Sequence, residues 1–474
     1  MSYFKTILVL VIVMLLPIYG FAQGIAVGPE FPVNPNGSNN PRGTSVAWSG
    51  KEFMVVWEDA NCLGDTQSAI FGVRIDSLGN LMDTRVIPIS VDSLNVDSLN
   101  RGCPQISLGK SKYLVVWEKS HLPSTLYSGC GVYAARMDIS GEVLDPNGIL
   151  ISSGSYTNPS VCWDGTKWFV VWHNDIAGNG NDIFGTWVDT LGVVLNPEGI
   201  VISASSTANQ AYPKVCWGGN KYFVTWNDDR LHPPYQTDIF GARVESNGNV
   251  LDPEGICLVS DYGYQWYSSV ASSGKQYFAV WTDLKGYYND VYGARVDTSG
   301  EVLDNPSVPI CTDTIHQSAN GLCWDNTNYL VVWQDNRDGE WDIYGARVNP
   351  SGSVLDVQGV PISNLSVPEV SATSAHSKGK RNLVLYQRAE PNGIYGRIVI
   401  DESSYLEGDA SGDGLIDIAD VVYLTNYLFK NGAKPSHLNS ADVNADCKID
   451  LADVVHLINY LYKNGPAPQM GCVE

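Results

Sequence analysis

The chain has 474 residues, with 29 lysines and arginines against 51 aspartates and glutamates, so its formal net charge is −22. Hydrophobic residues make up 44% and charged residues 17% of it, a balance that indicates a folded protein and excludes wholesale disorder. The acidic charge argues against a nucleic-acid partner, because phosphate binding depends on lysine and arginine side chains.

The first segment of the chain has the pattern of a signal peptide. Lys5 precedes an unbroken apolar run over 7–16, and Gly20 and Ala22 are small residues suited to a cleavage site. This run is too short to cross a bilayer, which needs about 20 apolar residues, and no later segment approaches that length. We therefore expect residues 1–22 to be removed after about Ala22, leaving a secreted, extracellular protein with no membrane span.

Residues 24–401 contain a repeat of about 55 residues. An aromatic motif, seen as KEFMVVWEDA at 51–60 and SKYLVVWEKS at 111–120, occurs seven times. Its central aromatic residues are Trp57, Trp117, Trp172, Trp226, Trp281, Trp333 and Tyr386. Seven units at this period indicate an array and exclude helical hairpin repeats, whose periods are about 33 to 47 residues.

Each unit contains four strand candidates separated by turns. In one unit the first three are SVCWD at 160–164, WFVVWHN at 168–174 and DIFGTWVD at 182–189, and a typical fourth is GICLVS at 255–260. Short β-branched and aromatic runs with Gly, Asn and Asp between them predict antiparallel hairpins. We therefore expect a mostly β fold, a seven-bladed β-propeller with four antiparallel strands per blade.

The two ends of the array predict how the ring closes. The seventh unit has three strands, at about 369–400, and then runs on without a fourth. The fragment at 28–37 resembles the tail of a unit such as 252–260. We expect Phe31–Asn34 to supply the missing strand of the last blade, an N-terminal strand that removes an exposed sheet edge.

Most repeated residues favour structural roles. We interpret the aromatic column as packing between blades, since each ring follows an apolar run. One Asp column and one Arg column recur too regularly to form a single active site, and we expect hairpin hydrogen bonds or blade-to-blade ion pairs from them. These residues are Asp182, Asp238, Asp290 and Asp342, and Arg243, Arg295 and Arg347.

The loops that break the repeat are the better place to look for function. The loops between second and third strands differ most, and strand alternation places them on one face with the connections between blades. The candidate ligand residues on this face are Tyr235, Tyr262, Tyr264, Trp266, Tyr287, Tyr288 and Trp341. Aromatic rings among carboxylates suit a glycan or a protein partner, and ordinary loop decoration is an equal alternative.

Ten cysteines in an exported chain could form disulfides. Cys62, Cys103 and Cys130 fall on the same predicted face, so one pair among them is a candidate disulfide. A second group, consisting of Cys162, Cys216 and Cys323, shares one column of the repeat. We expect these three to be small, buried apolar residues.

No catalytic motif stands out in the sequence. H-E-x-x-H, G-x-S-x-G, a P-loop and an intact sialidase Asp-box are all missing from it. Paired carboxylates for glycoside hydrolysis stay open as an alternative, because Asp is abundant and the two partners need only be close in space. The catalytic residues, if there are any, are unknown at this stage.

The C-terminal segment carries a duplicated acidic motif, at 409–432 and again at 442–465. Oxygen donors fall at positions 1, 3, 5, 9 and 12 of each loop, with a backbone carbonyl at position 7, which is the spacing of a twelve-residue Ca²⁺ loop. The predicted ligands are Asp409, Ser411, Asp413, Leu415, Asp417 and Asp420, then Asp442, Asn444, Asp446, Lys448, Asp450 and Asp453. We expect two Ca²⁺ ions, Ca²⁺-dependent folding, and an amphipathic helix behind each loop.

This duplicated segment resembles the type I dockerin domain over about residues 405–470. The resemblance implies a small all-α calcium-binding domain that binds a cohesin-type module and attaches a secreted protein, often one that degrades polysaccharide, to a scaffold or surface. It also implies a set of partner-binding residues: Ile418, Ala419, Thr425, Asn426, Lys430, Leu451, Ala452, Ile458, Asn459 and Lys463.

Two features depart from the dockerin pattern. Cys447 stands at loop position 6, where the first loop has Gly414, and a positive φ is preferred there, so we expect the second site to be strained or weaker. Cys447 is also a candidate to pair with Cys472. The apolar residues at loop positions 10 and 11 differ from the hydroxyl pair of cellulosomal dockerins, which leaves the cohesin specificity open.

The sequence thus predicts a secreted, calcium-binding dockerin protein whose propeller binds a glycan or a protein. The repeat resembles those of secreted bacterial β-propeller proteins, a likeness that implies no activity. The alternative is a polysaccharide-degrading enzyme, a glycoside hydrolase or lyase with a propeller catalytic domain. Such an enzyme would act on O-glycosyl bonds in polysaccharide catabolism.

Overall fold

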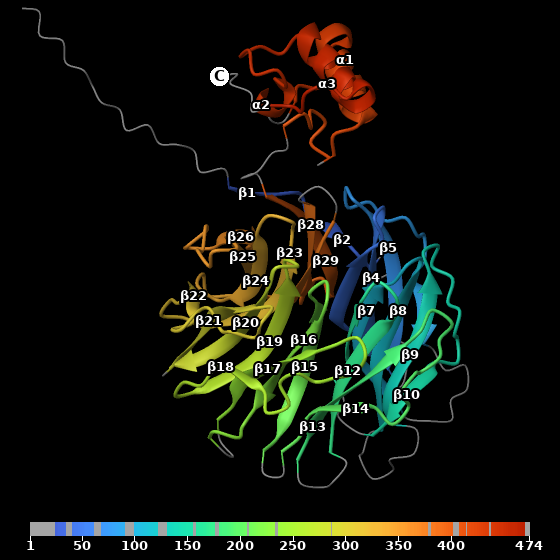
Figure 1. Cartoon of the computed structure of the whole chain (residues 1–474), viewed down its shortest axis with the longest axis vertical. Helices are drawn as coiled ribbons and strands as arrows, with labels where there is room; N and C mark the ends of the chain where they lie inside the picture. The colour runs from blue at the N-terminus through green and yellow to red at the C-terminus, as the bar shows by residue number, and fades with distance from the viewer. Residues whose placement is uncertain are drawn as a thin grey trace, which may run out of the picture.

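The structure is a computed structural model in which seven four-to-five-stranded sheets form a ring (Figure 1). It describes residues 24–34, 40–60, 68–90, 99–121, 130–154, 158–175, 180–205, 208–232, 236–285, 287–377, 381–401, 407–413, 415–435 and 438–469. The predicted signal peptide lies outside these residues.

Six blades are four-stranded antiparallel sheets, as the repeat predicts. From the inner strand outward, the first three are β3 (Pro41–Trp48), β4 (Glu52–Ala60), β5 (Ser68–Asp76) and β6 (Ile87–Ser90); β7 (Leu99–Leu108), β8 (Lys112–His121), β9 (Gly131–Asp138) and β10 (Ile149–Ser153); and β11 (Ser160–Trp163), β12 (Trp168–Asn174), β13 (Asp182–Val188) and β14 (Ile200–Ser203). The next three are β15 (Gln210–Trp217), β16 (Tyr222–Asp228), β17 (Asp238–Val244) and β18 (Ile256–Val259); β19 (Tyr264–Ser272), β20 (Gln276–Lys285), β21 (Tyr288–Asp297) and β22 (Val308–Cys311); and β23 (Gln317–Trp324), β24 (Tyr329–Asp335), β25 (Asp342–Val348) and β26 (Val360–Ser363).

The seventh blade confirms the predicted closure of the ring. Its first three strands are β27 (Glu369–His376), β28 (Arg381–Arg388) and β29 (Gly393–Asp401), and two N-terminal strands, β1 (Ile25–Val27) and β2 (Phe31–Pro32), pair with β29. The Val33 amide donates to the Ile394 carbonyl at 2.9 Å, and the Asn34 side chain accepts from the Ile394 amide at 2.9 Å. The expected closing segment is therefore in place, and β1 extends it.

The inner strands β3, β7, β11, β15, β19, β23 and β27 contact one another in sequence, and β27 contacts β3. They surround a central channel of about 440 Å³, lined by residues from all seven. The first strand of each blade starts at the end of the ring where the second strand ends. One mouth of this channel therefore opens on the predicted ligand face.

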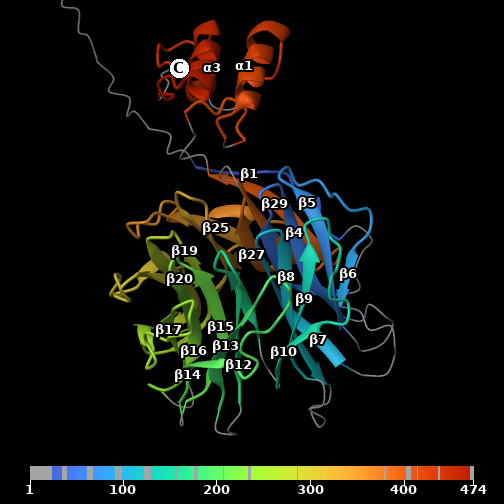
Figure 2. The ribbon, with the colours of Figure 1, turned by 45° about the vertical axis from the view of Figure 1, so that its right-hand side comes forward.

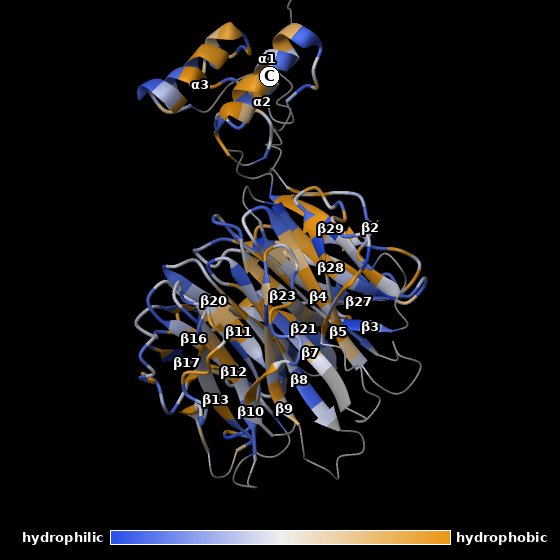
Figure 3. Cartoon of the chain, turned by 90° about the vertical axis from the view of Figure 1, so that its right-hand side faces the viewer, coloured by the Kyte–Doolittle hydropathy of each residue, from blue (hydrophilic) through white to orange (hydrophobic). Residues whose placement is uncertain are grey.

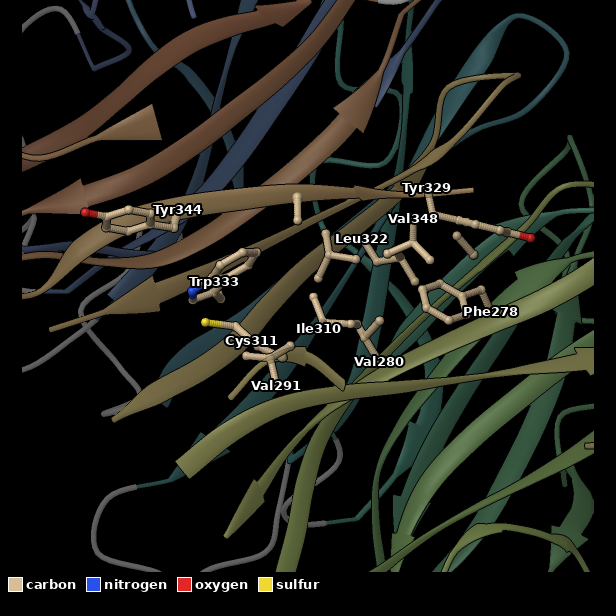
Figure 4. Packing of buried hydrophobic residues seen from close by; sticks show 14 residues of the cluster. Phe278, Val280, Val291, Ile310, Cys311, Leu322, Tyr329, Trp333, Tyr344 and Val348 are labelled. Carbon is tan, nitrogen blue, oxygen red and sulfur yellow. The ribbon is translucent and has the colours of Figure 1, made fainter. Parts of the chain in front are cut away.

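The aromatic column packs between blades, as expected. Trp226, Trp281, Trp333 and Tyr386 have no exposed surface, and Trp57, Trp117 and Trp172 are at most 2% exposed. Figure 4 shows one of these cores, in which Trp333 and Leu322 of one blade pack against Val280 and Ile310 of its neighbour.

The Arg column joins both hairpins and blades. Arg243 Nη2 lies 2.8 Å from Asp252 Oδ1 in its own blade, and Arg243 Nη1 donates to the Thr298 carbonyl of the next blade. Arg347 reaches further, with an ion pair of 2.6 Å to Asp401 of the seventh blade. Both predicted structural roles of this column are confirmed.

The C-terminal unit contains three helices: α1 (Ile418–Lys430), α2 (Leu438–Ala441) and α3 (Leu451–Lys463). Asp417 and Asp450 cap the starts of α1 and α3 in capping boxes, and Asn431 and Asn464 end them in the left-handed conformation. Leu424 and Leu457, both fully buried, pack the two helices together, which lie side by side in Figures 1 and 2.

Both long helices carry apolar residues, which are orange in Figure 3, and several of them, including Val422 and Val455, are exposed. None of the helices within the described residues is long and apolar enough to cross a membrane.

Candidate functional sites

The channel mouth is built from one repeated backbone feature. At the start of each inner strand, one residue occupies a bulge position two residues before the residue that pairs with the second strand. The residues at this bulge position are Gly43, Cys103, Asn158, Tyr212, Tyr267, Ala319 and Ser371, and all except Ala319 have a positive φ. Their side chains surround the mouth, where a cavity of about 270 Å³ opens beside the channel.

A side chain from the preceding blade holds most of these bulges. The residue that follows the core aromatic residue accepts a hydrogen bond from the bulge amide of the next blade. The four donor–acceptor pairs are Asn158 N to Glu118 Oε2 at 3.2 Å, Tyr212 N to His173 Nδ1 at 3.4 Å, Ala319 N to Thr282 Oγ1 at 3.0 Å, and Ser371 N to Gln334 Oε1 at 3.1 Å. The position needs only an acceptor, which explains why Glu, His, Thr and Gln all occupy it.

Burial shifts the pKa of two residues at this position. It lowers the pKa of His173 to about 4, so the ring is neutral and its Nδ1 atom can accept. In the first blade the equivalent residue is Glu58, whose pKa is raised by burial although Arg42 lies against it with Nη2 2.9 Å from Oε1. The carboxylates at the mouth are thus engaged in joining blades and strands.

Aromatic rings form a continuous track from the channel mouth outward. Tyr212 and Tyr267 lie edge to face with ring centroids 5.7 Å apart, Trp266 follows at 6.4 Å from Tyr267, and Tyr264 lies 5.7 Å from Trp266. We call these four residues the aromatic track. Tyr212 is 40% and Tyr267 54% exposed, so the rings can take part in contacts with a ligand.

The predicted ligand residues fall into separate groups. Tyr264 and Trp266 belong to the aromatic track. Tyr287 and Tyr288 form a second pair, 5.2 Å apart, with His316 beside Tyr288. Tyr262 is 81% exposed, Trp341 is partly buried, and Tyr235 lies outside the described residues.

The candidate disulfide at this face is wrong for the one pair that can be examined. No disulfide joins Cys103, which is exposed, to Cys130, which is buried, while Cys62 lies outside the described residues. Cys162 and Cys216, in the predicted apolar column, are free, and burial raises the pKa of both thiols. These two residues therefore pack as neutral side chains.

The first acidic loop gathers its predicted ligands. Asp409, Asp413 and Asp420 each bring one carboxylate oxygen to within 4.8 Å of the others, and Asp420 is fully buried. Oxygen atoms are the ligands that Ca²⁺ prefers, so the donor set fits this ion. Asp417 has a different environment, because its Oδ1 accepts from the Ala419 amide at 2.6 Å at the start of α1. Ser411 donates from its amide to Asp420 Oδ1 at 2.9 Å.

The second loop repeats this hydrogen bonding less compactly. Asp453 is fully buried and accepts from the Val443 amide at 2.9 Å, and Asp450 caps α3 as Asp417 caps α1. Asp446 is exposed and accepts from Asn444 Nδ2 at 3.2 Å. No carboxylate triad like that of the first loop forms here within the described residues.

Cys447 occupies position 6 of this second loop. Its φ is +65°, the left-handed conformation that glycine adopts most readily, as the loop position predicts. Its amide donates to Asp442 Oδ2 at 3.0 Å, and its sulfur forms a disulfide. The expected partner, Cys472, lies outside the described residues, as does Gly414 of the first loop.

The partner-binding residues implied by the dockerin resemblance lie on the two long helices. At the helix starts, Ile418 is 51% and Leu451 56% exposed, and Ala419 and Ala452 are also exposed. Further along, Lys430 and Lys463 are exposed, whereas Thr425, Asn426, Ile458 and Asn459 are partly buried.

Sequence reasoning missed several exposed side chains. On the helices these are Val422, Phe429, Val455 and Tyr462, which continue the apolar surface that begins at Ile418 and Leu451. At the channel mouth they are Tyr212 and Tyr267. Alignment of the seven units would have shown the tyrosines, since the same column otherwise holds Gly, Cys, Asn, Ala and Ser.

Comparison with solved structures supports the propeller fold. An ulvan lyase, a polysaccharide lyase bound to -[GlcA(1-4)Rha3S]-, has a TM-score of 0.54 at 10% identity, covering 79% of this chain and 96% of that one. A second ulvan lyase structure gives 0.52 at 10% identity, with 81% and 96% coverage. A protein of unknown function from Dyadobacter fermentans gives 0.49 at 12% identity, with 80% and 99% coverage. At such identities the likeness concerns the fold alone.

Comparison of the sequence with protein families concerns the C-terminal unit. No curated protein matches the chain. Residues 407–462 match the family model of the dockerin type I domain, and this range holds both acidic loops and almost all of α1 to α3. The C-terminal unit of this chain is therefore a type I dockerin domain, which follows a seven-bladed β-propeller.

Proposed function

We propose that this protein is an extracellular glycan-binding component, which its dockerin domain attaches to a cohesin-type module. The dockerin family assignment supports the attachment. The pattern of residues 1–22 supports export, since a short apolar run with small residues before the cleavage site is typical of a secretory signal.

Calcium would organise the docking surface. The residues suited to hold it are those of the two loops, and in the first loop three carboxylate oxygens face one another and would repel without a cation. Each loop leads directly into a helix that exposes apolar residues, Ile418 and Val422 on α1 and Leu451 and Val455 on α3. An apolar surface of this kind suits a protein partner.

The aromatic track is the observation that carries glycan binding. Sugar rings have apolar C–H faces that pack on aromatic rings and hydroxyl groups that form hydrogen bonds. The track offers four neighbouring rings, and the cavity beside Tyr212 and Tyr267 is lined by polar groups, including Thr44, Gln105 and Ser268. A protein ligand would gain less from such a narrow pocket.

The enzyme alternative has weaker support from the same surface. Glycoside hydrolysis needs two carboxylates free to act on the sugar. At the channel mouth, Glu118 accepts the Asn158 amide and Glu58 pairs with Arg42, so both carboxylates already serve the fold. A glycan-binding role accounts for the aromatic track and does not require these two carboxylates.

A glycan array probed with the full-length protein tests this proposal. We expect binding to polysaccharide fragments, and a loss of binding in Trp266→Ala with little change in Tyr288→Ala, which lies in the second aromatic pair. A cohesin panel with Ca²⁺ and with chelator tests the attachment. If no glycan binds, or if Trp266→Ala binds as well as the unchanged protein, the glycan role is wrong.

A further inference from the structure

The cavity at the channel mouth has one charged residue among the described residues that line it. Lys214, on β15, lines both this cavity and the central channel. The other lining groups are backbone, hydroxyl, amide, thiol and apolar groups, including Thr44 and Gln105. A single ammonium group among neutral polar groups is an uncommon arrangement for a structural position.

Lys214 also breaks the repeat. The same position, opposite the residue before the core aromatic residue, holds Ser45, Ser160 and Ser269 in three other blades. Two of these hydroxyls join neighbouring inner strands, since Ser45 Oγ accepts from the Ile106 amide and Ser160 Oγ from the Val215 amide, each at 3.3 Å. The remaining three blades have Gln105, Gly321 and Thr373 here, so serine is the commonest residue at this position and Lys214 is the one charged residue.

The ammonium of Lys214 makes no hydrogen bond and no ion pair within the described part of the chain. The side chain is partly buried, and burial lowers its pKa, because the charged form loses water without gaining a partner. An anion at this point would supply the missing partner.

Tyr212 and Tyr267 are the second departure from the repeat. Their φ angles are +58° and +56°, a conformation that costs about 1 kcal/mol or more for a residue with a bulky side chain. A positive φ is shared by six of the seven bulge positions, so the departure lies in the side chains, since only these two positions carry aromatic rings. Tyr212 is 40% and Tyr267 54% exposed, which leaves both rings available to a ligand.

We infer that this cavity binds an acidic sugar residue, whose ring contacts Tyr212 and Tyr267 and whose carboxylate or sulfate group lies against Lys214. The inference rests on the proposed glycan-binding function and adds the chemical class of the sugar. The ammonium supplies a charge-assisted hydrogen bond to the acidic group. The Thr44 hydroxyl, which has no hydrogen-bond partner within the described residues, and the Gln105 amide also line the cavity and could bind the sugar hydroxyls.

Isothermal titration of the full-length protein with matched oligosaccharides tests the inference. The probes are trigalacturonate, its neutral methyl ester and a sulfated oligosaccharide of similar length. We expect the acidic probes to bind about tenfold more tightly than the ester, the loss typical of one hydrogen bond to a charged group. The carboxylate and sulfate arms show which acidic group the site prefers.

Three variants separate the charge from the rings. Lys214→Ser restores the repeat, so it should fold with an unchanged melting temperature and bind the acid and the ester equally. Lys51→Ser, on an exposed turn, controls for the loss of one positive charge. Tyr212→Asn uses the residue found at the same position in Asn158, and it should weaken all probes.

Two results would overturn the inference. If the ester binds as tightly as the acid, or if Lys214→Ser keeps the preference for acid, the acidic sugar is wrong while glycan binding stands. If none of the probes binds and the array also shows no glycan, both the inference and the proposed function fail.

Discussion

The imidazole of His173 joins the third blade to the fourth, because its Nδ1 atom accepts a hydrogen bond from the Tyr212 amide at 3.4 Å. This contact is one of four of the same kind around the channel mouth, in each of which a side chain of one blade accepts a hydrogen bond from a bulge amide of the next. It also links the fold to the candidate ligand site, since Tyr212 presents its ring to the cavity.

The pH dependence of stability should report this contact. The pKa of His173 is about 4 in the folded protein against 6.5 for a free histidine, so the unfolded chain binds more protons between these values. Stability present above pH 6.5 should be lost as the pH falls toward 4, by on the order of 3 kcal/mol.

His173→Gln isolates that loss. Gln334 performs the same task in the sixth blade, so a glutamine should keep the hydrogen bond without titrating. Urea unfolding at pH 7 and pH 4.5 should show a smaller difference for the variant than for the unchanged protein. Equal differences would mean that His173 does not contribute to acid sensitivity.

Glu369 predicts the opposite pH dependence. It is fully buried at the start of β27, and the equivalent residues at or next to the start of three other inner strands are Gln210, Gln265 and Gln317. Burial, with Glu30 and Asp342 nearby, raises its pKa to about 7, so the folded protein binds more protons than the unfolded chain between pH 4.5 and 7. The native state is therefore penalised as the pH rises through this range.

Glu369→Gln should remove that penalty. We expect the variant to be more stable than the unchanged protein at pH 8, by on the order of 2 kcal/mol, and nearly equal at pH 5. Thermal melts at the two pH values check this. A variant that is less stable at pH 8 would show that the carboxylate is favourable when ionised.

The N-terminal strands should contribute to the stability of the whole ring. Phe31 packs against Gly79 of the first blade and Gly396 of the last, and Val33 is fully buried in the core between them. Phe31→Ala should cost about 3 kcal/mol, as large-to-small changes in cores do.

Deletion of residues 24–34 is the stronger test of ring closure. It leaves the edge of β29 unpaired, so we expect a lower melting temperature and a tendency to aggregate. Val27→Ala, a milder change on β1, serves as the matched control. A melting curve unchanged by the deletion would contradict the closing role of these strands.

Calcium titration of the full chain should show two binding events. Asp420→Asn and Asp453→Asn should each remove one event, because both side chains are fully buried at position 12 of their loops. Asp417→Asn should keep binding nearly intact, since asparagine caps a helix as well as aspartate does. Loss of a binding event in Asp417→Asn would instead make this carboxylate a direct ligand.

The sequence predicted the parts of this molecule that depend on local patterns. Strand β12 covers the same residues as expected, 168–174, because a short run of aromatic and β-branched residues with turn residues at both ends leaves little freedom in its limits. The closing segment at Phe31 was predictable because the last unit lacked a strand that the first fragment could supply. The helix ends at Asn431 and Asn464 followed from the Asn-Gly pairs.

The channel mouth depends on arrangement across blades, and for that reason it escaped prediction. Tyr212 and Tyr267 are far apart in sequence and meet because adjacent inner strands carry the same bulge. The sequence around Lys214 contains no motif that marks it as a ligand-binding residue. It stands out only by comparison with the same position in other blades, three of which have serine there. Of the disulfide pairs that the sequence left open among Cys62, Cys103 and Cys130, the Cys103–Cys130 pair is not formed, and Cys103 lies instead at a bulge position of the mouth.

The pairing of β1 and β2 with β29 also determines when the ring can close during biosynthesis. The first residues to emerge have their partner strand more than 350 positions later, so the ring stays open until nearly the whole propeller has been translated. Until then the other six blades form an open ring whose two ends are not joined. A chain with this design therefore becomes a closed ring only once its last propeller strand, β29, is available to pair with β1 and β2.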